Sequence, residues 1–203
     1  MKKILVAVAV VIIIVLTSGI FFIYSGRYNI AATSKDSAVA HWLIHTTMKR
    51  SVKRRAEGIT PSKDFVLTDP ATIRIGFNHY REMCIICHGA PGVKPGEAHA
   101  GLNPQPPLLA AKLVKGMSPA ELFWVIKNGI KMTGMPAWGP THSDDQIWAI
   151  VAFVKQLPTL TAADYRAMQQ PKPMKGPGND RDHQSEAPNT DQHDYEANPD
   201  HAL

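Results

Sequence analysis

The feature that most constrains this chain is its only pair of cysteines, which lie two residues apart in the stretch MCIICHG. Cys84 and Cys87 are followed directly by His88. In a chain of 203 residues, two cysteines cannot form the disulfide framework that stabilises small secreted domains. The fold must therefore rest on a hydrophobic core, and the cysteine pair is available for chemistry.

Three kinds of site use cysteines at this spacing. A thioredoxin-like redox pair requires flanking strands in a βαβ unit, and the sequence shows no convincing strand pattern. A structural zinc ion requires four ligands, and the chain has no second cysteine pair. The third is covalent attachment of a c-type haem, for which Cys-x-x-Cys-His is the sequence signal. In that case Cys84 and Cys87 would form thioethers to the haem vinyl groups, and His88 would be the proximal iron ligand.

A haem that only carries electrons needs a sixth ligand, and methionine fills that place and raises the potential. Met132 and Met135 both lie in the Gly- and Pro-containing stretch NGIKMTGMPAWGP. Such a loop is an unusual place for a methionine that only fills a core. We expect Met135 to be the axial ligand, because Pro136 stiffens the chain beside it. Met132 is the alternate ligand.

The residues around these motifs predict short helices. Asp69 followed by Pro70 is typical of a helix start, and Ser118 and Ser143 each begin a capping box. A set of apolar and small residues before the cysteines shares one helical face: Ile73, Gly76, Phe77, Tyr80 and Cys84. We therefore predict an all-α domain over residues 68–160.

The rest of the chain divides into three parts. Ile4–Tyr24 has no charged residue, and about 20 apolar residues span a bilayer. We expect residues 1–25 to be an uncleaved membrane anchor, because a cleaved signal usually has a shorter apolar core; a cleaved signal is the alternative. Residues 26–67 are expected to be a connector. Residues 161–203 are expected to be a C-terminal extension, largely a disordered acidic tail.

The connector contains a basic amphipathic helix. Its apolar face is predicted to carry Trp42, His45, Met48, Val52 and Ala56. The helix either packs on the globular domain or lies on a membrane surface, attracted to anionic headgroups.

The net charge of the chain is only +5, and no basic stripe interleaved with aromatic residues indicates a nucleic-acid partner.

Together these residues resemble the class I c-type cytochromes over about residues 69–158. CIICHG resembles the haem-binding motif of that family and GMPA its distal-methionine motif. Gly76 and Tyr80 fit the family's glycine and aromatic residue before the haem motif, which implies a close crossing with the last helix near Phe153. The resemblance also implies that Pro107, with Pro106 as the alternative, accepts a hydrogen bond from His88. That contact would fix the orientation of the imidazole ring.

The whole pattern resembles membrane-anchored monohaem cytochromes of proteobacteria. The resemblance implies one covalent haem c and a cytochrome c-like fold behind one transmembrane helix. Because the family attaches haem outside the cytoplasm, it also implies an inner-membrane protein with its haem domain in the periplasm. We expect a one-electron carrier that exchanges electrons with redox partner proteins and is not an enzyme. The alternatives are a haem sensor or peroxidase-like enzyme with a labile sixth ligand, and a haem-free dithiol protein.

Overall fold

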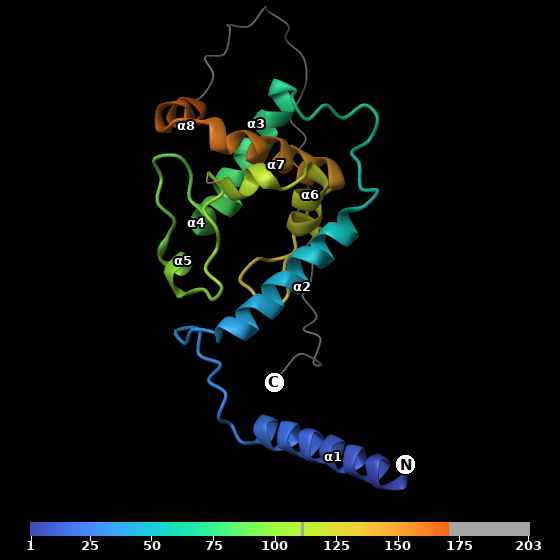
Figure 1. Ribbon diagram of the computed structural model, residues 1–203. Coiled ribbons are helices and arrows are strands. Elements are labelled where there is room, and N and C mark those ends of the chain that lie inside the picture. The colour runs from blue at the N-terminus through green and yellow to red at the C-terminus, as the bar shows by residue number, and fades with distance from the viewer. Residues whose placement is uncertain (111, 171–203) are drawn as a thin grey trace, which may run out of the picture. The chain divides into compact units, whose positions relative to one another are not determined.

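The computed structural model describes residues 1–110 and 112–170; the tail predicted to be disordered from residue 171 lies outside the described residues. The described part is helical and contains no β-strand, which confirms the all-α prediction. Figure 1 shows its order: α1 (Lys2–Tyr24), α2 (Ala38–Ala56), α3 (Pro70–His79), the π-helical turn η1 (Tyr80–Cys84), α4 (Ile85–His88), α5 (Glu97–Gly101), the 3-10 turn η2 (Lys112–Gly116), α6 (Pro119–Asn128), α7 (Asp144–Gln156), the 3-10 turn η3 (Leu157–Thr159) and α8 (Ala162–Gln169).

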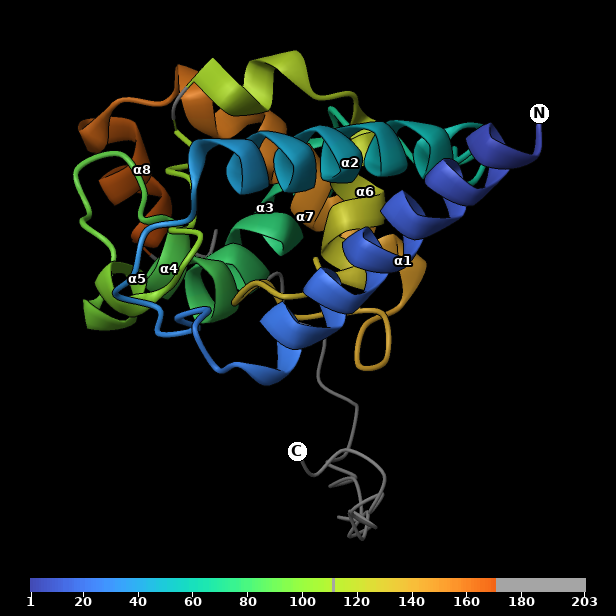
Figure 2. The same ribbon diagram turned by 60° about the horizontal axis from the view of Figure 1, so that its bottom comes forward.

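The crossing of α3 and α7 is the centre of the core (Figures 1 and 2). Gly76 makes this crossing close, since a Cβ atom there would lie 1.9 Å from the carbonyl oxygen of Ala149. Next to this contact, the Phe153 ring packs on two other aromatic rings. Its centroid lies 5.5 Å from that of Phe77 and 5.2 Å from that of Tyr80. This is the helix crossing that the resemblance implies.

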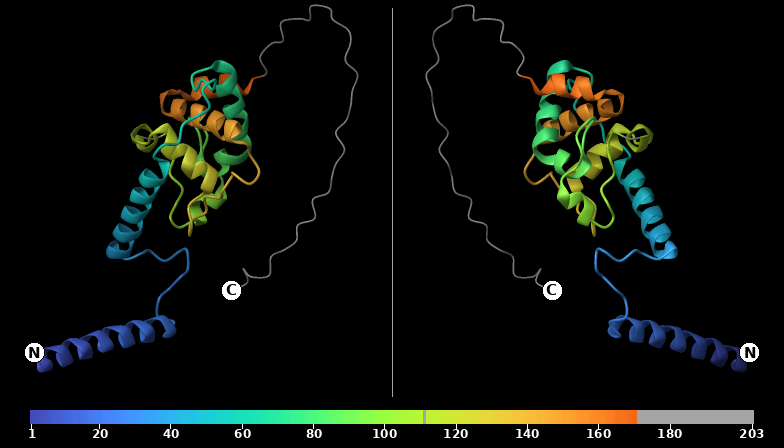
Figure 3. Two further views of the ribbon diagram at one scale, coloured as in Figure 1. Left: turned by 90° about the vertical axis from the view of Figure 1, so that its right-hand side faces the viewer. Right: turned by 90° about the vertical axis from the view of Figure 1, so that its left-hand side faces the viewer.

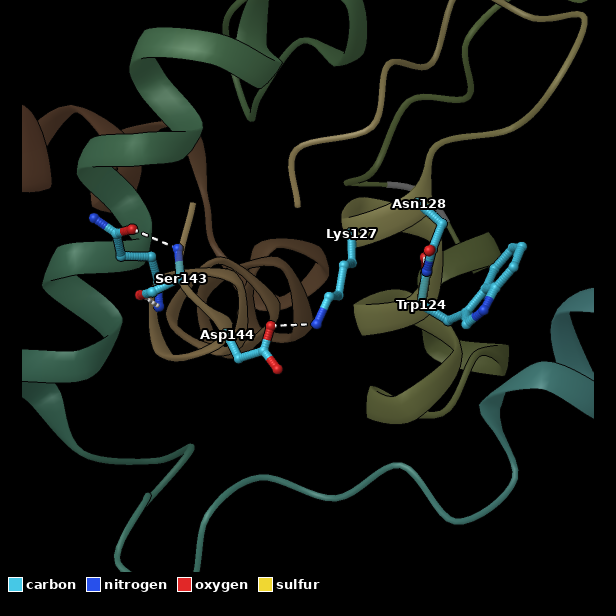
Figure 4. Close-up of polar contacts among 6 residues, drawn as sticks. Trp124, Lys127, Asn128, Ser143 and Asp144 are labelled. Atoms are coloured by element: carbon cyan, nitrogen blue, oxygen red, sulfur yellow. Dashed lines mark hydrogen bonds and ion pairs between the residues drawn. The ribbon is translucent and has the colours of Figure 1, made fainter. Parts of the chain in front are cut away.

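The helix starts follow the sequence signals. The Asp69 carboxylate accepts the backbone N–H of Thr72 at 2.8 Å and caps α3. Ser118 and Ser143 form complete capping boxes at the starts of α6 and α7. Figure 4 shows the second box, together with an ion pair of 2.5 Å between Lys127 Nζ and Asp144 Oδ1. That pair joins the end of α6 to the start of α7, at the base of the loop between them.

The packed core extends past residue 160, where we expected the globular domain to end. Thr161 and Asp164 form a third capping box, which starts α8. Tyr165 on α8 is fully buried, and its ring centroid lies 5.5 Å from that of Phe77. α8 therefore belongs to the helical domain (Figure 3), and we place the end of that domain near Gln169.

The connector helix and the apolar helix differ in how they pack. In α2, Val52 and Ala56 are buried and the helix lies along α6. Trp42 and His45, which we expected on the same helix face as Val52, are exposed. α1 is an apolar helix of 23 residues, none of them buried, and it is long enough to cross a membrane.

Candidate functional site

The cysteine–histidine motif lies at the end of a helix that begins at Pro70. α3 passes into α4 through the π-helical turn η1, in which the Ile85 N–H bonds to the carbonyl oxygen of Tyr80. π-Helical turns of this kind occur frequently at functional sites. The helix stops at Gly89, whose φ of +61° belongs to the left-handed region that glycine adopts readily. Cys84, Cys87 and His88 therefore occupy the last five residues of one helix.

A buried hydrogen bond joins the end of this helix to the start of its π-helical turn. The Tyr80 hydroxyl donates to the Gly89 carbonyl oxygen at 2.5 Å. Burial of the Tyr80 ring, with a smaller contribution from Cys84, raises the pKa of its hydroxyl well above the usual value. The hydroxyl consequently stays protonated and keeps its role as donor. The buried Tyr80 side chain thus links the residues just before the motif to the residue just after it.

The two cysteines are free thiols and both are partly buried. Burial, and then the neighbouring Cys87, raise the pKa of the Cys84 thiol to about 12. Nucleophilic and redox-active cysteines instead have a lowered pKa, because the thiolate is their reactive form. The environment of Cys84 therefore disfavours a thiol–disulfide exchange site in the protein without haem.

His88 has one ring nitrogen engaged and one available. Its Nδ1 lies 2.8 Å from the carbonyl oxygen of Pro107. Because a carbonyl oxygen can only accept, Nδ1 carries the proton and Nε2 is left with its lone pair. Burial lowers the pKa of His88, against the opposing effect of the Pro107 hydrogen bond. A neutral imidazole with a free Nε2 is the form that binds a metal.

A second histidine forms a hydrogen bond to the motif, and sequence reasoning did not identify it. His99 on α5 has its Nδ1 2.7 Å from the carbonyl oxygen of Cys87, to which it donates a hydrogen bond. One of the exposed carbonyls at the end of α4 is thereby satisfied. His99 lies on the short helix α5 between His88 and Pro107 and belongs to no periodic pattern. No local signal in the sequence marks it.

The two candidate methionines have different environments. Met132 is 87% exposed and sits at a positive φ of 61°. Met135 is partly buried and packs against the same hydrophobic core as Cys84. The side chain of Met135 is therefore directed to the interior, whereas that of Met132 lies in solvent.

Hydrogen bonds within the loop set the backbone of Met135. Its N–H donates to Thr133 Oγ1 at 3.1 Å, and the Thr133 hydroxyl donates to Ile130 O at 2.7 Å. The Ile130 N–H donates to the Met135 carbonyl oxygen at 3.2 Å. Gly129 lies directly under this turn, where a Cβ atom would be 2.7 Å from that carbonyl. The loop is a closed turn folded back on the end of α6.

The donor set fits a c-type haem. Two neighbouring thiols, an imidazole with a free Nε2 and a thioether directed into the core are the groups that covalent attachment and axial ligation of a haem would require. The described residues contain no group of three or more His, Cys, Asp and Glu side chains that could hold a bare metal ion. A haem suits these residues better than an isolated zinc or iron ion.

A family model agrees with this fit. Residues 71–154 match the family model described as "Cytochrome C oxidase, cbb3-type, subunit III". Among solved structures, the chain is similar to one from the reducing HAO-like protein complex of Kuenenia stuttgartiensis, with 24% sequence identity and a TM-score of 0.40. That match covers 50% of this chain and 52% of the other, about half the length of each. Comparison with curated proteins gives no match.

Proposed function

We propose that this chain, whose residues 71–154 are a c-type cytochrome domain, carries single electrons through one covalently attached haem c at a membrane surface. Cys84 and Cys87 are the attachment points, and His88 and Met135 are the axial ligands. The observation that carries this assignment is the hydrogen bond of 2.8 Å from His88 Nδ1 to Pro107, beside two partly buried free thiols. It leaves Nε2 as the atom that would meet the iron.

When bound, the haem supplies one-electron chemistry, since its iron cycles between the ferric and ferrous states. The protein fixes the surroundings of that iron. Pro107 holds the proximal imidazole in one tautomer and orientation, which also raises its strength as a ligand. The core around Phe77, Tyr80 and Phe153 packs against one side of the motif. No residue among these is placed to move a proton to or from a substrate.

The Met135 loop decides between an electron carrier and a ligand-binding haem protein. A methionine in the sixth position blocks small molecules and raises the reduction potential. The inward packing of Met135 and the hydrogen-bonded turn that holds it favour a filled sixth position. We therefore favour electron transfer over a sensor or peroxidase function, in which the sixth position opens.

We further propose that α1 anchors the protein in the inner membrane, with the cytochrome domain in the periplasm. The support for the anchor is the length and apolar composition of α1. The support for the side of the membrane is the resemblance to cytochromes whose haem is attached outside the cytoplasm. The redox partners would be proteins that bind on that side.

The test is spectroscopic. We would express the full chain together with a haem-attachment system and isolate the membrane fraction. The protein from that fraction would be run on a denaturing gel and stained for haem. Covalent haem should stay with the chain and should be lost in Cys84→Ser with Cys87→Ser. In the native protein, the ferric form should show the weak far-red band of methionine-ligated haem. Absence of that band together with rapid CO binding by the ferrous form would overturn the carrier proposal in favour of a ligand-binding haem.

A further inference from the structure

The connector helix α2 has two halves with different surroundings. Its C-terminal half packs on α6 and buries Val52 and Ala56 (Figure 2). Its N-terminal half leaves large apolar side chains in solvent, each between 57% and 74% exposed: Val39, Trp42, Leu43 and Ile44. Adjacent apolar side chains exposed in this way usually mark a site of interaction with a protein or a membrane.

The exposed side chains continue onto the face of α2 that points away from the domain. Leu43 lies nine residues before the buried Val52, which places it half a turn around the helix. Arg50 and Arg54 fall on nearly the same line, two residues to either side of Val52. We call the surface formed by Val39, Leu43, Arg50 and Arg54 the α2 outer surface; Trp42 and Ile44 flank it, each about 100° around the helix from Leu43. It is apolar at its N-terminal end and cationic at its C-terminal end, where Arg54 also pairs with the exposed Glu57 at 2.7 Å.

The position of this surface in the chain favours a lipid partner over a protein. Only residues 25–37 separate α1 from α2, and a chain of that length reaches at most about 45 Å. The exposed apolar side chains of Tyr28 and Ile30 lie within that short segment. A bilayer that holds α1 is therefore always within reach of α2. Tryptophan and basic residues are also the side chains that favour the membrane–water interface.

We propose that the α2 outer surface lies in the interface of the same bilayer that α1 enters. Trp42, Leu43 and Ile44 sit at the boundary of headgroups and acyl chains. Arg50 and Arg54 bind anionic headgroups. The inference rests on the part of the proposed function that makes α1 a membrane anchor, and it goes beyond it, because an anchor alone would leave the cytochrome domain on a loose tether.

A contact between the connector and the haem region gives this docking a consequence. The Asn103 side-chain amide donates to the Ser34 carbonyl oxygen at 3.1 Å. Asn103 lies in the loop that leads to Pro107, the partner of His88. When α2 lies on the membrane, this contact and the packing of α2 on α6 set which side of the cytochrome domain faces the bilayer.

The test is site-specific photo-crosslinking of the full chain in vesicles of phosphatidylethanolamine and phosphatidylglycerol. Leu43→p-benzoylphenylalanine should give a phospholipid adduct after illumination, identified by mass on the peptide that contains residue 43. Val15→p-benzoylphenylalanine, within α1, reports the anchor by itself. Ile75→p-benzoylphenylalanine, on α3 and similarly exposed at 48%, should give no lipid adduct. The haem absorption spectrum confirms that each variant is folded.

The outcomes separate the two proposals. A lipid adduct at both residue 15 and residue 43 supports docking. An adduct at residue 15 but none at residue 43 overturns the docking inference and leaves the anchor intact. An adduct from residue 43 to a protein, including a second copy of this chain, also overturns it, because the surface then binds a protein. No adduct at residue 15 removes the anchor and the docking together.

The cationic end of the surface has its own control. Arg50→Gln with Arg54→Gln should reduce the yield of the lipid adduct at residue 43 severalfold in anionic vesicles. It should have little effect in vesicles of phosphatidylcholine alone, where the headgroups carry no net charge. An equal yield with and without the two arginines in anionic vesicles would overturn the assignment of Arg50 and Arg54 to headgroup binding.

Discussion

The two sides of the candidate haem site are built differently. The His88 side ends a helix that is packed into the core, and Tyr80, Pro107 and His99 all hold it by hydrogen bonds. The Met135 side is a loop that hydrogen bonds mostly to itself and to the end of α6. We therefore expect that the His88 side is lost only when the domain unfolds, whereas the Met135 side opens locally. On this view stability and ligand access are controlled by separate parts of the molecule.

The largest expected effect is on the crossing that supports the His88 side. Gly76→Val would place side-chain atoms where the Ala149 carbonyl oxygen already lies 1.9 Å from a Cβ position. Because backbone must move to relieve this contact, we expect a loss of about 3 kcal/mol or more in the free energy of unfolding. Urea denaturation followed by circular dichroism measures it. Gly101→Val, at a glycine with no atom within 4 Å of its Cβ position, is the matched control and should change stability little.

The next effect is on the Met135 side. Met135→Ala should lower the reduction potential and let CO bind the ferrous protein, because the sixth position is then open. Met132→Ala should do neither, since that side chain is 87% exposed. Redox titration and CO difference spectra measure both. If Met132→Ala alone produced the two effects, the assignment of the axial methionine would be wrong.

A smaller effect should come from the turn that holds Met135. Thr133→Val removes the hydroxyl that bonds to Ile130 O and to the Met135 N–H. At about 1 kcal/mol for a hydrogen bond, opening of the loop should become roughly fivefold more favourable. The rate of imidazole binding to the ferric protein reports this opening. Thr133→Ser keeps the hydroxyl and should retain the original rate; a similar increase in both variants would mean that the hydrogen bonds do not control opening.

The smallest effect should separate the two sides most clearly. His99→Ala removes the hydrogen bond to the Cys87 carbonyl oxygen, and we expect a loss of about 1 kcal/mol in the free energy of unfolding. Imidazole binding should keep its rate, because the Met135 loop is untouched. A faster rate with unchanged stability would show that the His88 side also opens locally, and the distinction between the two sides would fail.

The sequence predicted those elements whose signals are local. Asp69, Ser118 and Ser143 marked helix starts because a capping side chain must lie close to the backbone that it caps. The close crossing at Gly76 was expected through the resemblance, and the absence of a side chain there leaves room for the second helix. The start of α8 carries the same kind of signal in Thr161 and Asp164. We ended the domain at residue 160, after the helix that Pro158 stops, and did not use this later signal.

The features that the sequence did not predict depend on distant contacts. Only the packing of α2 on α6 separates the buried Val52 from the exposed Trp42, since both fit one helical face. The contact of His99 with Cys87 depends on how a loop returns to the motif. Pro107 was expected only through resemblance, because nothing in the spacing between residues 88 and 107 fixes which carbonyl oxygen meets the imidazole. The π-helical turn likewise had no local signal.

That turn makes the length of one segment matter more than its composition. η1 holds one residue more than a regular helical turn would between Tyr80 and Ile85. Removing a residue from Arg81–Met83 would give a more regular helix, yet it would rotate the following motif by about 100° relative to Tyr80. Point substitutions at the exposed Arg81 and Glu82 should be tolerated, whereas a single-codon deletion should abolish haem attachment. In a lineage of such proteins, insertions and deletions should accumulate in the loop after His88 and be absent here.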